Sequence, residues 1–132
     1  MGVYRERILR AGVPNGNGRI YSRELLEAAI GKYMARTVRF GELGMPPKFE
    51  VTLGKVSHTV DSLSIDSDGY LVAEGRFLDN DRGREAESMW LEGHMRMRTR
   101  ASGEVAGDGT VSNLTLFAVD LTEDPAAVER ES

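Results

Sequence analysis

The pattern of apolar and polar positions along the chain predicts a mostly β protein with two helices. Strands are expected where apolar and polar residues alternate, or where short apolar runs lie between turn residues. Six segments meet this description, and one of them contains a break near Asp61, which makes about seven strands. The segments are Val3–Val13, Thr37–Leu43, Leu53–Ile65, Tyr70–Leu78, Met95–Ala101 and Val111–Leu121.

Two segments have the 3.6-residue spacing of helices with one buried face. The first spans Ser22–Arg36, where Ser22 is expected to cap the free N–H groups of the first turn. The second follows Asp79 or Asn80, either of which is a suitable cap, and carries Ala86 and Trp90 on its apolar stripe. Both helices are expected to cover a β structure from outside.

Turn residues separate the strands and favour hairpins. Asp66-Ser67-Asp68-Gly69 and Gly107-Asp108-Gly109 suit hairpin turns, which need residues that tolerate positive φ. Many hairpins with peripheral helices predict an antiparallel β-barrel or sandwich. We expect one domain over residues 1–121, followed by a polar tail over 122–132.

Composition narrows the functional classes. The 132 residues contain no cysteine, which excludes disulfides and thiolate metal sites, and only two histidines, so no metal or cofactor is expected. A net charge of -4 argues against general nucleic-acid binding. No apolar run approaches the roughly 20 residues of a membrane span, and no signal peptide is evident at the N-terminus. An intracellular protein is therefore expected.

Six segments, in order along the chain, together resemble the prohead (capsid-maturation) serine proteases of tailed bacteriophages, whose fold is related to herpesvirus assemblins. They are Asn17–Ser22, Phe40–Pro46, Val56–His58, Leu78–Gly83, Arg98–Gly103 and Val119–Ala126. The corresponding family patterns are N-G-R-I-Y-P, G-E-L-D-H-P, V-S-H, L-D-T-P-x-G, S-S-R-G-x-G and I-D-x-V-x-x-P-S. The resemblance implies a β-barrel of the prohead-protease type, with about seven antiparallel strands and two helices.

Two departures from the family patterns bear on activity. The family's expected general base, the histidine of G-E-L-D-H-P, is replaced by Met45, and its nucleophile, the first serine of S-S-R-G, by Arg98. A thioether cannot take a proton near neutral pH, and a guanidinium has no lone pair for attack. A serine protease needs a hydroxyl beside a base. The resemblance therefore implies the fold of a protease without its chemistry.

Four other residues are candidates to restore activity, each with a structural alternative. His58 is a possible replacement base, but a structural histidine in the barrel wall is favoured. Thr99 and Ser102 carry hydroxyls near the lost nucleophile, although packing for Thr99 and turn chemistry for Ser102 are better explanations. Asp120 matches the family's aspartate, yet without a base to orient it is only a polar residue.

Three arginines follow one another on one face of a predicted strand: Arg96, Arg98 and Arg100. The simpler interpretation is a solvated face that limits strand-edge aggregation. The alternative is contact with acidic groups of a partner, because arginine binds carboxylates in bidentate pairs. Met45, in a proline-containing loop, is a further candidate contact or a plug in the former cleft.

These observations predict a pseudoprotease that acts as a structural part of a phage head, as a decoration, cement or scaffold protein assembled in the host cytoplasm. Its partner would be the major capsid protein, with self-association left open and no nucleic-acid or membrane partner. Two alternatives remain. One is an active maturation protease with a non-standard catalytic set, and the other is an unrelated β-barrel binding module.

Overall fold

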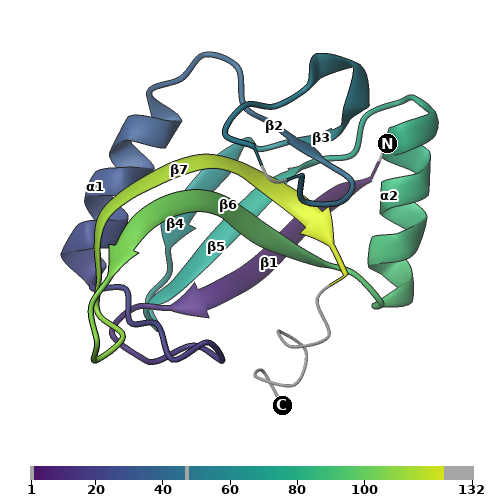
Figure 1. Ribbon diagram of the computed structural model, residues 1–132. Coiled ribbons are helices and arrows are strands. Elements are labelled where there is room, and N and C mark those ends of the chain that lie inside the picture. The colour runs from purple at the N-terminus through teal and green to yellow at the C-terminus, as the bar shows by residue number, and fades with distance from the viewer. Residues whose placement is uncertain (1, 47, 124–132) are drawn as a thin grey trace.

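The computed structural model describes residues 2–46 and 48–123, which form seven strands and two helices (Figure 1). The strands are β1 (Val3–Arg10), β2 (Phe40–Glu42), β3 (Val56–Thr59), β4 (Ser62–Ile65), β5 (Tyr70–Arg76), β6 (Arg96–Val105) and β7 (Val111–Thr122). The helices are α1 (Arg23–Met34) and α2 (Asp81–Glu92), with a 3-10 turn at Leu53–Lys55.

The strands form three antiparallel sheets and not a closed barrel, so the predicted barrel is wrong. One sheet has the order β1-β5-β4, and β2 pairs with β3 and β6 with β7. Isolated bridges such as Leu43 to Leu121 and His58 to Phe77 connect the sheets. Local alternation predicts strands and hairpins, but closure depends on pairing between distant edges, and β2 and β3 are only 3 and 4 residues long.

Both helices begin where the sequence predicts. The Ser22 hydroxyl accepts from the Leu25 N–H at 3.1 Å, and the Asn80 side chain accepts from the Gly83 N–H at 2.7 Å. In Figure 1, α1 and α2 lie at opposite ends of the strands. α1 packs on β7 and β4, and α2 packs on β3. One apolar core joins the helices to the sheets, with Leu26, Leu71 and Met97 all at 0% exposure.

The strand predicted over Thr37–Leu43 is shorter than expected, and the side chain of Arg39, just before it, bonds back to the end of α1. The Arg39 guanidinium donates to the carbonyls of Met34 and Arg36 at the end of the helix. It also donates to Val60 at 3.0 Å. These bonds satisfy carbonyls that a helix end leaves free, and only Phe40–Glu42 remains in β2.

The other segments agree with the sequence patterns more closely. The expected break near Asp61 is confirmed, since β3 and β4 are separate strands, and the Asp66–Gly69 turn joins β4 to β5. β6 continues to Val105, beyond the predicted end. Most of the predicted tail, from residue 124 on, lies outside the described residues.

Candidate functional site

The register of β6 and β7 brings the family-motif positions of both strands together. Arg98 lies directly across from Asp120, and Arg100 lies across from Ala118. The β6–β7 ladder shifts register between Arg100 and Ala101, and again between Ser102 and Glu104. β2 and the end of β7 are also adjacent through the Leu43–Leu121 bridge. The segments that contain Glu42, Arg100 and Asp120 therefore meet in one place.

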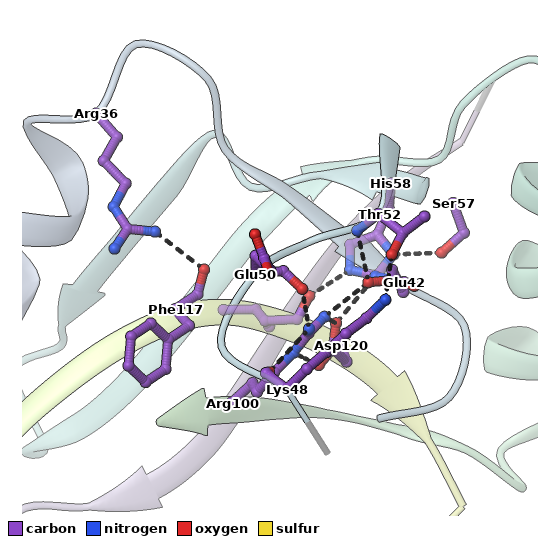
Figure 2. Close-up of polar contacts among 11 residues, drawn as sticks. Arg36, Glu42, Lys48, Glu50, Thr52, Ser57, His58, Arg100, Phe117 and Asp120 are labelled. Atoms are coloured by element: carbon purple, nitrogen blue, oxygen red, sulfur yellow. Dashed lines mark hydrogen bonds and ion pairs between the residues drawn. The ribbon is translucent and has the colours of Figure 1, made fainter. Parts of the chain in front are cut away.

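Arg100 and Asp120 form a buried, two-pronged ion pair at this meeting point (Figure 2). The Arg100 Nε and Nη2 atoms each donate to an Asp120 carboxylate oxygen at 2.8 Å. Nη2 also donates to Glu42 Oε2 at 3.1 Å. The side chains of Arg100, Asp120 and Glu42 are 5%, 0% and 3% exposed. We call these three residues the ionic cluster.

The ionic cluster also holds the loop that follows β2. Arg100 Nη1 donates to the Glu50 carbonyl at 2.9 Å and to the Lys48 carbonyl at 3.4 Å. Glu42 Oε2 accepts from the Thr52 N–H at 3.1 Å. Asp120 in turn accepts from the Glu42 N–H at 2.9 Å. Arg100 thus binds groups inside its own chain, and its buried guanidinium is not part of an exposed arginine face.

Opposing effects act on the pKa of Asp120. Burial is the stronger effect and raises the pKa of this carboxyl above its ordinary value, while the Arg100 donors and the Glu42 N–H act in the opposite direction. The same contact with Asp120 raises the pKa of Arg100 above its ordinary value. An arginine keeps its charge in proteins, so the geometry is that of a charge-assisted pair that offsets part of the cost of burial.

His58 belongs to a second buried network, with Ser57 and the Val119 carbonyl (Figure 2). Its Nε2 lies 2.6 Å from the Val119 oxygen, which can only accept, so Nε2 carries the proton. Nδ1 then accepts from the Ser57 hydroxyl at 2.8 Å. Ser57 and His58 are both 0% exposed. We call these residues the histidine network.

Burial keeps His58 neutral. It lowers the pKa of His58 from 6.5 to about 4, against an opposing effect from the Val119 carbonyl. The approach of the ring depends on Gly41, since a Cβ there would lie 2.1 Å from His58 Nε2 and 1.8 Å from the Val119 oxygen. Both ring nitrogens of His58 are therefore already bonded to groups inside the protein in this conformation.

A groove of about 950 Å³ opens beside the ionic cluster. It is lined by Met45, Arg98 and Thr99, together with residues from β1 and from the 13–19 loop. The two substituted positions of the family pattern thus face one groove. The same groove contains none of the described histidines among its lining residues.

The remaining predicted residues lie on β6 and in the loop after β2. Ser102 is half-buried within β6, opposite Thr115, and the turn it was expected to begin starts further on. Arg96 lies near Glu6 of β1, with Nε 3.4 Å from a carboxylate oxygen. Met45 is 39% exposed on the groove. The described residues contain no group of three or more His, Cys, Asp or Glu side chains that could hold a metal ion.

Sequence reasoning missed Glu42 and Ser57. Glu42 carries a charge, which usually indicates the surface, and Ser57 is one small residue in an apolar strand. The available signal was the glycine at position 41, next to Glu42, because a glycine in a strand marks close approach of another group. Nothing local indicated that His58 would be that group.

The arrangement of strands and helices defines a prohead-protease-like fold, as the sequence motifs predict. Among solved structures, the chain is similar to the bacteriophage T4 capsid assembly protease gp21, with a TM-score of 0.79 and 22% identity over 93% of this chain and 82% of that chain. No protein-family model and no curated protein matches the sequence. In the described part of the chain, no helix is long and apolar enough to cross a membrane.

Proposed function

We propose that this chain is a non-catalytic protein of the prohead-protease fold that serves as a structural component of a phage head. The observation that carries the proposal is the content of the groove: a methionine and an arginine stand at the positions where the family resemblance expects a base and a nucleophile. Neither side chain can perform that role.

The positions of the other candidate residues support the same conclusion. His58 is buried away from the groove lining with both ring nitrogens bonded, and Asp120 is bound by Arg100. A catalytic triad needs a base within hydrogen-bond reach of its hydroxyl. His58 hydrogen-bonds to Ser57 and to the Val119 carbonyl, and neither Thr99 nor Ser102 is among its partners.

The proposed partner is the major capsid protein, bound without cleavage. The likeness to a capsid assembly protease supports this choice of partner, and the arginines that line the groove fit acidic partner groups. The chain would then act as a decoration, cement or scaffold protein.

The proposal is tested with the purified chain and the major capsid protein of the same virus. We expect a stable complex in analytical ultracentrifugation, an unchanged intact mass of the capsid protein, and no labelling by a serine-directed fluorophosphonate. Retention in purified mature virions at high copy number is the matching result in the particle. Capsid-protein cleavage that is lost in a His58→Ala or Ser102→Ala variant would instead establish an active protease with a non-standard catalytic set.

A further inference from the structure

The groove lies where two sheets fail to join. β1 is an end strand of its sheet, and β6 is paired with β7 on one side only. Figure 1 shows β6 running alongside β1. Near one end they are linked through Glu6, whose carboxylate accepts from the Met97 N–H at 3.0 Å. Further along, the groove separates them.

The groove meets both strands at their edges. Consecutive residues line it on each side, Arg7 to Arg10 from β1 and Arg98 to Ala101 from β6. Successive side chains of a strand point to opposite faces, so a cavity that touches four residues in a row faces the strand edge. A strand edge presents backbone N–H and C=O groups that can pair with another chain.

One backbone donor on the edge of β6, the Thr99 N–H, is free of the β6–β7 ladder. The Met97 N–H points away from β7, because it donates to Glu6 on the β1 side. In an antiparallel ladder, alternate residues direct their backbone groups to the same side. The Thr99 N–H, two residues further along β6, therefore points into the groove.

The charge of the groove selects an acidic occupant. Seven of its lining residues are arginine or lysine, and one, Glu123, is acidic. Arg7, Arg96 and Arg100 already have carboxylate partners. Among the described residues, no carboxylate forms an ion pair with Arg10, Arg19 or Lys48. This excess of positive charge occurs in a chain whose net charge is -4.

We call the groove between the unpaired edges of β1 and β6 the open seam. We propose that the open seam binds an extended, acidic polypeptide segment of a partner, which adds a strand to the edge of β6. The backbone of the segment would pair with the Thr99 region, and its carboxylates would lie near Arg10, Arg19 and Lys48. Strand addition gives affinity through the main chain and specificity through alternate side chains. The proposal rests on the proposed function only in that the bound segment is held and not cut.

The first experiment uses a fluorescein-labelled ten-residue peptide of alternating Glu and Val, titrated with the full chain and followed by fluorescence anisotropy. We expect saturable binding that weakens with added salt. A control peptide of the same length, with Lys in place of each Glu, should show no comparable binding. Two further Glu/Val peptides carry N-methyl groups on either the Glu or the Val backbone nitrogens. At least one should bind about tenfold more weakly, because it loses main-chain hydrogen bonds on the β6 side. Equal binding of all three acidic peptides would overturn strand addition.

Matched variants locate the site. Arg19→Gln should weaken peptide binding about two- to fivefold, as expected for one partly exposed charge contact, whereas Arg82→Gln on α2 should leave it unchanged. Equal effects of the two variants would overturn the assignment to the seam.

The backbone contact is tested at position 99. Thr99→Pro removes the N–H that points into the groove and leaves the N–H groups that bond to β7 in place. It should weaken binding of the Glu/Val peptide about as much as N-methylation of the peptide does. If this variant does not fold, hydrogen exchange of the Thr99 amide in the unaltered chain replaces it. Slower exchange with the Glu/Val peptide supports the proposal, and unchanged exchange at saturation overturns it.

The same samples separate this proposal from the proposed function. Cleavage of the bound peptide, seen in its intact mass, would refute the non-catalytic role and leave the strand pairing in place. Binding that is insensitive to N-methylation would refute the strand pairing and leave the non-catalytic role in place.

Discussion

Two polar networks lie inside this protein, a short distance apart along β7, and they differ in charge. The ionic cluster joins Arg100 to Asp120 and Glu42, with the Arg100–Asp120 contacts at 2.8 Å. The histidine network joins His58 to Ser57 and Val119 and carries no charge. Both are almost inaccessible to solvent.

The comparison of the two networks shows which partners allow a buried group to keep its charge. Asp120 has an opposite charge and the Glu42 N–H beside it, so these partners offset part of the desolvation cost that raises the pKa of its carboxyl. His58 has only a hydroxyl and a carbonyl as neighbours, and the free energy favours the neutral ring. A buried group thus keeps its charge or loses it according to its immediate partners.

The largest expected effect comes from removing the cation of the ionic cluster. Arg100→Met would leave Asp120 and Glu42 buried without it, and we expect a loss of about 3–5 kcal/mol in the free energy of unfolding. The loss for Arg100→Lys should lie between zero and the loss for Arg100→Met, because lysine keeps the charge without the bidentate geometry. Denaturant unfolding measures both values.

The control for this prediction is an exposed ion pair of the same type. Arg23 pairs with Glu27 on α1, with side chains 55% and 58% exposed. Arg23→Met should cost no more than about 0.5 kcal/mol. Equal losses for Arg100→Met and Arg23→Met would show that burial does not strengthen the dependence on the cation.

The next effect is a pH dependence that originates in the histidine network. The pKa of His58 is about 4 in the folded chain, against the ordinary value of 6.5 expected in the unfolded chain. Between pH 4 and pH 6.5 the unfolded state therefore binds a proton that the folded state does not. Stability is therefore fully present above pH 6.5 and decreases as the pH falls toward 4, by about 3 kcal/mol for this one group.

This dependence is measured by denaturant unfolding across pH 4 to 7, and a His58→Gln variant provides the comparison. Its stability should be nearly flat over the part of that range above the carboxyl pKa values, even if the variant is less stable throughout. A slope equal to that of the unaltered chain would assign the pH dependence to other groups.

The smallest effect compares two glycines. Gly41→Ala would place a Cβ against the Val119 carbonyl and the His58 ring, and we expect a loss of about 1–3 kcal/mol from overpacking. Gly31, within α1, has nothing within 4 Å of the added Cβ. Gly31→Ala should instead stabilise the chain by up to about 1 kcal/mol. Thermal unfolding of the two variants gives opposite shifts, and a neutral Gly41→Ala would show that the histidine network tolerates displacement.

Local structure could be predicted from the sequence wherever one segment determines it. Ser22 and Asn80 cap helices through bonds to residues three positions away, and the Asp66–Gly69 turn joins neighbouring strands. The prohead-protease-like fold could be anticipated because several motifs occur in the family's order. These features require no knowledge of distant contacts.

The ionic cluster and the open seam could not be predicted, because both depend on segments far apart in the chain. Alternation on β6 suggested an exposed face of three arginines, whereas Arg100 meets Asp120 and Glu42 from β7 and β2. Alternation of polar and apolar residues predicts which face of a strand a residue occupies, but it does not predict what packs against that face. For the same reason the hairpin pattern suggested a closed barrel.

The long separations within the ionic cluster have a consequence for how the protein reaches its final form. Arg100 bonds to Glu42 across 58 positions and to Glu50 across 50, and Glu42 bonds to Asp120 across 78. Contacts of such high sequence separation slow folding, because large loops must close before they form. During synthesis Asp120 is the last of the three to leave the ribosome, so Glu42 and Arg100 remain hydrated until β7 has been made, and the loop after β2 can take its final place only after that.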